Sequence, residues 1–548
     1  MKKDDLIQVT IEDMSAEGAG IGKMDGFPLF IKDAVIGDTV EAKVMKLKKN
    51  YGFARLVRVL SPSPDRVEPL CPQARRCGGC QIQEMSYPAQ ARFKENKIFS
   101  NLQRIGGYEP AVLEAAREPF LAMENPWRYR NKAQFPVGLS KDGRVIAGFY
   151  AGRTHSIIES SQCFLGKECN EEILRILLDW MEEFHIPPYR EETGKGLVRH
   201  ILIRCGFSSG QIMVCLVLNG ERLPHAEELV SRLTKLPGMT SICLNVNRQR
   251  TNVILGQTVL PLWGQTWIED SIGEIRYRIS PLSFYQVNPV QTRRLYEKAL
   301  EYAALTGSET VWDLYCGIGT ISLFLARNAK QVCGVEIIPA AIQDARQNAA
   351  LNGITNAAFF VGRAEEVLPE QYAKGDARAD VIVVDPPRKG CEESLLNTIA
   401  RMCPERVVYV SCDSATLARD LKYLRERGYE LRKWCGVDQF PMTAHVETVV
   451  LLSKGEIDSK KVRVEFSLED MDMSGFQKGA TYEQIKAYVL EKHGLKVSSL
   501  YISQVKRKCG LEIGQNYNLS KKEDAKVPQC PLEKEEVIID ALKHFQII

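Results

Sequence analysis

Between Leu6 and Val59, apolar and polar residues alternate around glycines. The segment 40–44 (VEAKV) alternates strictly, and the segment 18–22 (GAGIG) supplies residues that favour tight turns. A period of two with turn residues at short intervals is typical of short, half-buried strands. The sequence therefore predicts a small β-barrel over residues 1–60.

The central part of the chain, residues 61–275, predicts a mixed α+β domain. It opens on Ser61-Pro62-Ser63-Pro64, which has the composition of a linker. A helical pattern follows from about Pro88 to Ile105, and strand-like and helical patterns then alternate as far as about Asp270.

From Thr310 the sequence pattern changes to apolar strands that alternate with helices. These lie within a predicted domain over residues 276–455. The expected strands are Thr310–Tyr315, Gln331–Ile337, Ala379–Asp385, Arg406–Ser411 and Val446–Ser453. Such alternation predicts an α/β domain with a doubly wound, mostly parallel sheet, whose ligands bind at the carboxyl ends of the strands.

Residues 456–548 form a separate C-terminal tail in which two short helices are expected. Thr481 could cap the first, which would end at Gly494, and Ser498 or Ser499 could start the second, which runs to Lys508. The second ends in Lys506-Arg507-Lys508. Two short helices with a basic second helix are typical of a nucleic-acid-binding module, and equally of a small helical cap with a solvated charged face.

The net charge of the 548 residues is +3, so any nucleic-acid surface must come from a local concentration of basic residues. One such segment, 43–58, lies late in the predicted barrel and surrounds Tyr51 and Phe53. Its basic residues are Lys43, Lys46, Lys48, Lys49, Arg55 and Arg58. Basic residues mixed with aromatic rings favour contact with phosphates and bases, although a solvated basic face has the same composition.

Secretion and membrane insertion are not expected. The N-terminal residues MKKDD lead into no apolar segment, and no run of about eighteen apolar residues occurs. The sixteen cysteines are scattered through a long chain, which favours reduced thiols, metal ligands or catalysis over disulfides. We therefore expect a cytoplasmic protein without a membrane partner, and we assume a monomer.

A strand that ends in a glycine turn predicts a cofactor site. Val311–Leu314 leads into Gly317-Ile318-Gly319, and a helix is expected over Ile321–Asn328. The third glycine of a dinucleotide fingerprint is replaced by Ser322, which favours a ligand without a pyrophosphate. The next strand ends in Glu336, placed to accept hydrogen bonds from ribose hydroxyls, so the order of elements favours an adenosine ligand.

Asp385 and Cys412 follow two later strands and are expected at the same edge of the sheet. Most cysteines in such a chain fill the core, but a strand-end thiolate can add to carbon 6 of uracil and make carbon 5 nucleophilic. A base must then remove the proton from carbon 5. Glu447, which precedes the final strand, is the predicted base, and His445 is an alternative.

These segments resemble the motifs of the RNA uracil-5 methyltransferase family. The matching sequences are DPPR at 385–388, SCD at 411–413, and FPMTAHVE at 440–447. The resemblance implies that Cys412 is the nucleophile and Glu447 the base. A further match, SFYQVNP at 283–289, implies that Gln286 joins Tyr315, Glu336 and Asp385 around S-adenosylmethionine. Thr320 stands where some members carry asparagine, so no cofactor contact is assigned to it.

Three cysteines, Cys71, Cys77 and Cys80, lie in one short loop with Gly78 and Gly79. Zinc would usually show two separated pairs, whereas three thiols with a distant fourth suit an iron–sulfur cluster. Cys163 is the best fourth candidate and Cys169 the next. The resemblance implies a 4Fe–4S cluster on Cys71, Cys77, Cys80 and Cys163, with a structural role, because methyl transfer requires no electrons; zinc and unliganded thiols are the alternatives.

The resemblance implies a Rossmann-like methyltransferase domain behind a central iron–sulfur domain and an N-terminal RNA-binding barrel similar to the TRAM domain. The expected activity is methylation of carbon 5 of uridine in RNA, most simply 23S ribosomal RNA, with transfer RNA as the alternative. A radical S-adenosylmethionine enzyme would need a different cysteine spacing. A non-enzymatic RNA-binding protein would not need Cys412 and Glu447 together.

Overall fold

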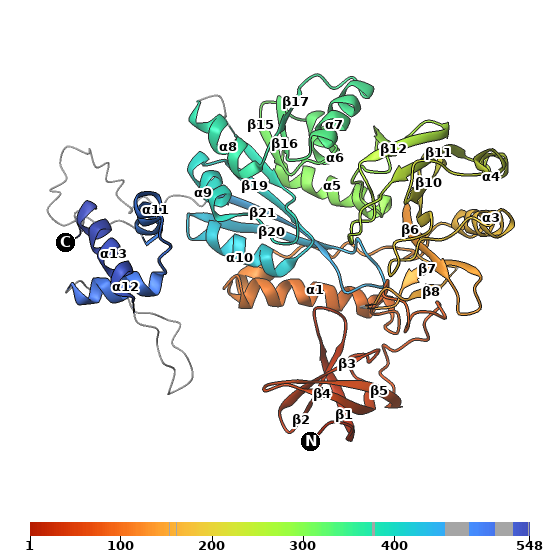
Figure 1. Cartoon of the computed structure of the whole chain (residues 1–548), viewed down its shortest axis with the longest axis horizontal. Coiled ribbons are helices and arrows are strands. Elements are labelled where there is room, and N and C mark those ends of the chain that lie inside the picture. The colour runs from red at the N-terminus through yellow and green to blue at the C-terminus, as the bar shows by residue number, and fades with distance from the viewer. Residues whose placement is uncertain are drawn as a thin grey trace. The chain divides into compact units, whose positions relative to one another are not determined.

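The computed structural model describes residues 1–152, 154–160, 162–374, 379–454, 482–509, 530–545 and 547. The chain divides into two compact units, Met1–Glu456 and Ile457–Ile548, which Figure 1 shows in one colour gradient. Of the helices described, none combines the length and the apolar character needed to cross a membrane.

The N-terminal strands close into a five-stranded barrel, as predicted. They are β1 (Leu6–Met14), β2 (Gly20–Met24), β3 (Phe27–Lys32), β4 (Thr39–Leu47) and β5 (Gly52–Ser61). The alternation seen in the sequence sends every second residue inward, so that Val9, Leu29, Val40 and Val44 form the barrel core.

The segment after the barrel is not a free linker. Ser63 is buried and donates its backbone N–H to the carboxylate of Asp38, and Arg66 pairs with the same carboxylate at 2.7 Å. Because Asp38 is fully buried, these bonds fix the start of the central domain to the barrel.

The central domain is built on a seven-stranded sheet. Its order is β12 (Thr258–Gly264), β11 (Met239–Val246), β10 (Ile212–Leu218), β9 (Val198–Cys205), β6 (Lys132–Leu139), β7 (Val145–Tyr150) and β8 (Ile157–Glu159). Helices α3 (Cys169–Glu183) and α4 (Ala226–Leu233) cover one face and bury Trp180 and Leu229. Leu202 and Met213 pack instead with Tyr277, from the hairpin β13 (Ile268–Ile272) and β14 (Ile275–Ile279).

A second seven-stranded sheet follows, and it is the predicted doubly wound sheet. Its order is β17 (Ala357–Val361), β16 (Gln331–Glu336), β15 (Thr310–Leu314), β18 (Val381–Val384), β19 (Arg406–Ser411), β21 (Glu447–Lys454) and β20 (Tyr429–Val437). The first five strands are parallel, and β21 runs antiparallel to both β19 and β20. β20 was not among the predicted strands.

Helices cover both faces of this sheet (Figure 1). Those on one face are α5 (Pro289–Ala303), α6 (Thr320–Ala326) and α7 (Pro339–Leu351); those on the other are α8 (Ala364–Ala373), α9 (Glu393–Met402), α10 (Ser414–Arg425) and, from far earlier in the chain, α1 (Tyr87–Arg104). Ile98 and Leu102 of α1 share a core with Leu417 of α10, and the short α2 (Pro110–Ala115) adds Leu113. Helix α1, which belongs to the central segment of the chain, therefore packs on the second sheet.

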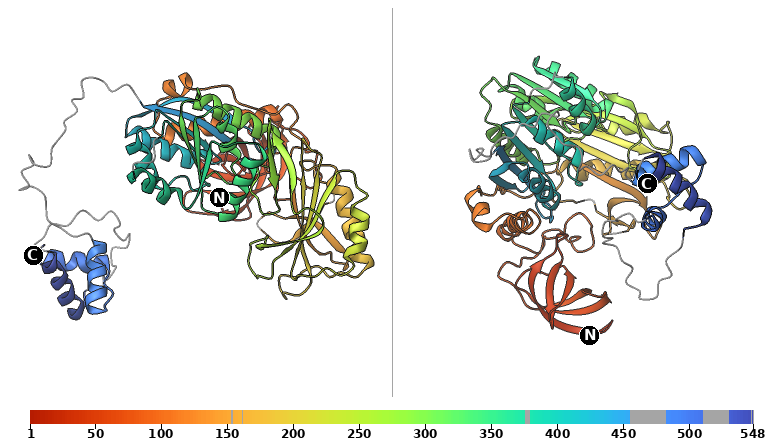
Figure 2. Two further views of the ribbon diagram at one scale, coloured as in Figure 1. Left: turned by 90° about the horizontal axis from the view of Figure 1, so that it is seen from above. Right: turned by 90° about the vertical axis from the view of Figure 1, so that its left-hand side faces the viewer.

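The tail unit contains α11 (Tyr482–His493), α12 (Ser499–Lys508) and α13 (Leu532–His544), seen together in Figure 2. The first two lie where the pattern predicts them: Gly494 follows α11 with a positive φ of 67°, and Ser498 caps α12. The third was not predicted, and Thr481, the expected first cap, lies outside the described residues. Ile485, Ile502 and Ile538 form the core of this unit.

Candidate active site

The carboxyl edge of the second sheet brings five of the predicted site residues together. Tyr315, Asp385 and Cys412 directly follow the parallel strands β15, β18 and β19, and Glu336 ends β16. Glu447 begins the antiparallel strand β21, and the pairing of Ser411 with Thr448 puts it beside Cys412 at the same edge.

Glu447 is a buried acid, with 3% of its surface exposed. Burial raises its pKa to about 8, and the nearby carboxylate of Asp385 acts in the same direction, while Arg388 opposes both. The pKa of Asp385 is itself raised to about 7 by burial and by Asp313. A carboxyl group with a pKa near neutrality is suited to proton transfer.

Cys412 is half-buried next to these carboxylates. Burial raises the pKa of its thiol to about 12, Glu447 and Asp385 add to the rise, and Arg388 counteracts it. The protonated thiol is therefore favoured in this environment, and a positive charge brought close to the sulfur would favour the thiolate. His445 instead packs its ring edge-on against Phe440, with 6.4 Å between the ring centres.

The turn after β15 forms an open cradle. Glu336 accepts hydrogen bonds from the backbone N–H groups of Gly317, at 3.2 Å, and Ile338, at 3.0 Å, which hold its carboxylate in place. Gly317 has a φ of 56°, and a Cβ there would meet open space. Ile337 and Ile338 are more than half exposed beside the carboxylate. An acid with apolar neighbours and free space fits a ribose and its base.

Tyr315 adopts a φ of 70°, a left-handed backbone conformation that is uncommon for a residue with a bulky side chain. Its hydroxyl donates to the Glu365 carboxylate at 2.6 Å, so the half-buried ring is held in one orientation next to the cradle. Thr320, to which no cofactor contact was assigned, accepts a hydrogen bond from the hydroxyl of Tyr296 at 2.9 Å.

Gln286, the remaining predicted cofactor residue, lies in the segment before α5 and is buried. Its backbone carbonyl accepts from the side chain of Asn131 at 2.9 Å, and the backbone N–H of Asn131 donates to Val287 at 2.8 Å. Its neighbour Phe284 is 71% exposed, which is unusual for an aromatic residue beside a buried segment. The central domain thus holds the segment that carries Gln286.

Two groups of functional interest were missed from the sequence. Asp313, inside β15, is fully buried with its pKa raised to about 7 by burial, and one of its oxygens has no hydrogen-bond partner. Arg130 and Lys132 flank Asn131. The buried Nε of Arg130 has no hydrogen-bond partner among the described residues, and burial with the charges of Arg204 and Arg130 lowers the pKa of Lys132 to about 7. Both groups could have been noticed in the sequence. Asp313 is an acid within an otherwise apolar strand, and the segment 128–132 is rich in basic residues.

The four predicted cluster cysteines, Cys71, Cys77, Cys80 and Cys163, are all half-buried and unpaired by disulfides. Burial raises the pKa values of Cys71, Cys77 and Cys80, in the last case to about 12, and the charge of Cys163 contributes to each rise. The four thiols are therefore neighbours in space. Within the described ranges, no group of three or more His, Cys, Asp or Glu side chains is arranged to hold a metal ion.

Cys169, the second choice for the fourth thiol, has another partner. Its sulfur lies 3.4 Å from that of Cys205 at the end of β9. This contact lowers the pKa of Cys169.

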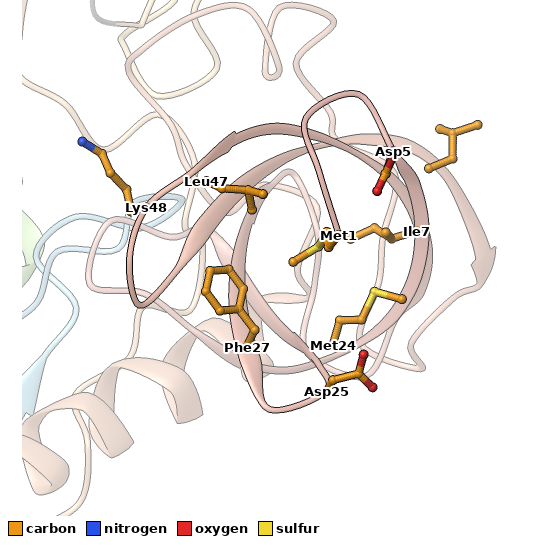
Figure 3. A pocket seen from close by; sticks show the side chains of 9 residues that line it. Met1, Asp5, Ile7, Met24, Asp25, Phe27, Leu47 and Lys48 are labelled. Carbon is orange, nitrogen blue, oxygen red and sulfur yellow. The ribbon is translucent and has the colours of Figure 1, made fainter.

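The basic segment of the barrel carries a group of aromatic rings. Tyr51 and Phe53 are each more than a third exposed, and both contact Phe30, with ring centres 5.6 and 5.7 Å apart. Lys43 pairs with Asp4 and Arg58 with Glu41. A cavity at one open end of the barrel is lined by Ile7, Met24, Phe27 and Leu47 with charged residues at its rim, and it includes none of the predicted site residues (Figure 3).

In the tail, the basic end of α12 is partly neutralised. Lys508 pairs with Glu535 of α13 at 2.6 Å, and the ammonium group of Lys506 lies 5.0 Å from the ring centre of Tyr482. The nucleic-acid-binding role of the tail remains a prediction.

Comparison with known proteins agrees with this architecture. A family model for tRNA (uracil-5-)-methyltransferases matches residues 264–455, and the TRAM domain model matches residues 5–57. An uncharacterised RNA methyltransferase of Halalkalibacterium halodurans is 52% identical over 453 residues, which cover 82% of this chain and 98% of that protein. One of Clostridium tetani is 49% identical over 83% of this chain and 97% of that protein.

Among solved structures, the tRNA (uracil-54, C5)-methyltransferase of Pyrococcus abyssi, in complex with S-adenosyl-L-homocysteine, is similar. It superimposes with a TM-score of 0.65 at 27% identity and covers 81% of this chain and 99% of that one. The family match ends at residue 455, before the tail unit. The chain belongs to the RNA uracil-5-methyltransferases, which take their methyl group from S-adenosylmethionine.

Proposed function

We propose that this protein methylates carbon 5 of a uridine in RNA through a covalent bond between Cys412 and carbon 6. The observation that carries the proposal is the meeting of a strand-end thiol and a buried acid of raised pKa, Cys412 and Glu447, at one sheet edge. The cradle at Glu336 and Gly317 lies at that same edge.

S-adenosylmethionine supplies an electrophilic methyl group when it is bound. Glu336 would bind the ribose, Tyr315 and Gln286 would enclose the cofactor, and Asp385 would lie between cofactor and base. The Cys412 thiolate adds to carbon 6, so carbon 5 becomes nucleophilic and takes the methyl group. Glu447 then removes the proton from carbon 5, the electrons of that bond restore the 5,6 double bond, and the thiolate leaves.

Ribosomal RNA, most simply 23S, is the proposed substrate, because the resemblance includes both the barrel and the four cysteines. Transfer RNA is the second candidate, because the similar archaeal structure is named for uracil 54 of tRNA. The aromatic group Phe30, Tyr51 and Phe53, with the basic residues around it, would contact the RNA away from the target base.

The activity is tested with purified protein, S-adenosylmethionine labelled in its methyl group, and total RNA from cells that lack the gene for this chain. We expect the label in 5-methyluridine after digestion to nucleosides, and fractionation of the RNA identifies ribosomal or transfer RNA as the acceptor. Label in any other nucleoside contradicts the proposal.

We expect the rate of product release to rise with pH. Because Glu447 acts as a carboxylate and its pKa is raised to about 8, the fraction of competent base falls below that pH. The decay of the preformed methylated adduct, followed from about pH 6 to about pH 9, should show this rise, steeper at low pH. Once the adduct has formed, ionisation of the Cys412 thiol, whose pKa is also raised, no longer contributes to the profile. A flat profile over the same range would contradict a titrating base of raised pKa.

We propose that Cys71, Cys77, Cys80 and Cys163 hold a 4Fe–4S cluster. The charge of Cys163 acts on each of the other three thiols, and three cysteines in one short loop with a distant fourth are a ligand pattern of such clusters. The cluster would stabilise residues 71–82, which we call the cysteine loop, as metals do where little apolar core is available.

Protein purified without oxygen should therefore contain iron and sulfide in equal amounts, about four of each per chain. Replacing Cys77 by serine should reduce both, whereas replacing the exposed Cys403 should not. Stoichiometric zinc without iron in the anaerobic protein would overturn the assignment.

A further inference from the structure

The segment between β20 and β21, residues 438–446, leads directly into Glu447, and we call it the base loop. It contains no helix or strand, and Met442 within it has a φ of 67°, which is unfavourable for a non-glycine side chain. Asp438, Gln439 and Met442 are nevertheless buried. A loop without regular structure keeps one conformation only when other parts of the fold hold it.

Three side chains of α1 hold the base loop. Gln90, Lys94 and Lys97 are spaced at i, i+4 and i+7, so they share one face of the helix. Gln90 accepts from the backbone N–H of Met442 at 3.0 Å. Lys94 donates to the carbonyl of Phe440 at 3.0 Å, and Lys97 to that of Ala444 at 2.9 Å.

One of these side chains, Lys94, also forms an ion pair with the base loop. The ammonium group of Lys94 lies 2.6 Å from a carboxylate oxygen of Asp438, and both side chains are fully buried. A buried pair is seldom more stable than two apolar residues of similar volume, because both charges lose their hydration. The pair instead fixes the conformation of the base loop, because one ammonium group binds both the carboxylate of Asp438 and the carbonyl of Phe440.

The cysteine loop and the central domain hold the other side of the base loop. The backbone N–H groups of Gln81 and Ile82 donate to the carbonyl of Met442 at 3.0 and 3.3 Å. The hydroxyl of Tyr129 donates to the carbonyl of Pro441 at 3.0 Å. Cys412, in contrast, follows β19 and is not part of the base loop.

From this arrangement we infer that Lys94 and Asp438 are positioning residues for Glu447, needed for removal of the carbon 5 proton and not for the steps before it. The inference rests on the proposed role of Glu447 as the base. A base must lie within hydrogen-bond reach of the proton it removes, and a misplacement of about 1 Å can slow a step by about 10²-fold. Cys412 lies outside the base loop, so we expect its addition to carbon 6 to proceed without the ion pair. The bonds from Asn288 and Gln291 of α5 to the backbone carbonyls of Gln439 and Asp438 do not involve either charged side chain, so we expect the nearby cofactor segment to be retained.

The test is a paired substitution in the full-length protein, Lys94→Met with Asp438→Leu. It replaces the ion pair by apolar side chains of similar volume and leaves no buried charge unpaired, but it removes the hydrogen bond to Phe440. Arg92→Met is the matched control, since it removes an exposed cation and its pair with Asp65 from the same helix. The variants are compared for S-adenosylmethionine binding and for single turnover on RNA from cells that lack the gene.

We expect the paired variant to bind S-adenosylmethionine and to transfer the methyl group, but to release product about 10²-fold more slowly. A methylated covalent complex of RNA and protein should accumulate on denaturing gels, as it should with Glu447→Gln. The control should accumulate none. A purely structural role would lower cofactor binding and adduct formation together.

Joint loss of cofactor binding and adduct formation in the paired variant would contradict the inference, and two further results would overturn it. The first is seen when Glu447→Gln traps a methylated adduct but the paired variant, although it binds S-adenosylmethionine, does not. Such a paired variant would either release product at the wild-type rate or form no methylated adduct. The second is normal product release by Glu447→Gln, which removes the base role itself and leaves nothing for Lys94 and Asp438 to position. The Glu447→Gln variant distinguishes the two failures. It traps a methylated adduct when only the positioning role is wrong, and it traps none when the base role is wrong.

Discussion

Replacing Cys412 by alanine should reduce methylation of RNA by at least about 10⁴-fold, to the background of the uncatalysed reaction. Without addition at carbon 6, carbon 5 of uracil remains a poor nucleophile, and no charge around the site can substitute for a covalent bond. Cofactor binding should be retained, because the cradle at Glu336 and Gly317 does not include the thiol. The measurement is incorporation of labelled methyl groups under single-turnover conditions.

Cys403 provides the matched control for this substitution. It is an exposed thiol in the same domain, at the end of α9 and away from the sheet edge. Cys403→Ala should retain wild-type activity. Substantial methylation by Cys412→Ala would show that another group activates the base or that the methyl group goes to a different atom.

The second large effect is expected from Glu447→Gln, which keeps the shape of the side chain and removes the base. Methyl transfer should proceed, but elimination should slow by about 10²- to 10⁴-fold, so one methylated adduct per enzyme accumulates instead of product. Removing a buried acid of raised pKa also removes the cost of ionising it, so the variant should remain folded near neutral pH.

The adduct is measured as a protein–RNA band that carries the methyl label and survives denaturation. Glu430→Gln is a suitable control, because this exposed glutamate lies at the far end of the β20–β21 hairpin. Product release by Glu447→Gln at the wild-type rate would contradict the assigned role, and His445 would become the candidate to test next.

The parts of the fold that follow from local pattern were predictable. Strict alternation in the barrel sends Val40 and Val44 into its core, and the apolar strands of the second sheet are buried on both faces. Because parallel strands share one carboxyl edge, strand-end residues such as Asp385 and Cys412 could be grouped from the sequence alone. Glu447 joined them because its strand runs the other way.

Contacts between distant segments were not predictable in the same way. The helix around 88–105 was expected, but nothing in its sequence indicates that Gln90, Lys94 and Lys97 bind a loop about 350 positions later. A lysine on a helix usually faces solvent, and only the buried Asp438 explains Lys94. β20 was missed because charged residues interrupt its first half.

The cysteine loop shows the same limit. Spacing indicates that Cys71, Cys77 and Cys80 share one centre, but it does not distinguish Cys163 from Cys169 as the fourth cysteine. In the structure Cys169 contacts Cys205, whereas Cys163 raises the pKa values of the other three thiols. The partner of a distant cysteine depends on tertiary packing and not on local sequence.

The covalent step is tested most directly by RNA that contains 5-fluorouridine in place of uridine. Fluorine cannot leave as a proton does, so the wild-type enzyme with S-adenosylmethionine should be trapped after methyl transfer. Digestion of the trapped complex followed by mass spectrometry should find the methylated fluorouridine on the peptide that contains Cys412. A nucleotide attached to any other residue, or no trapped complex under conditions in which ordinary RNA is methylated, would contradict the account.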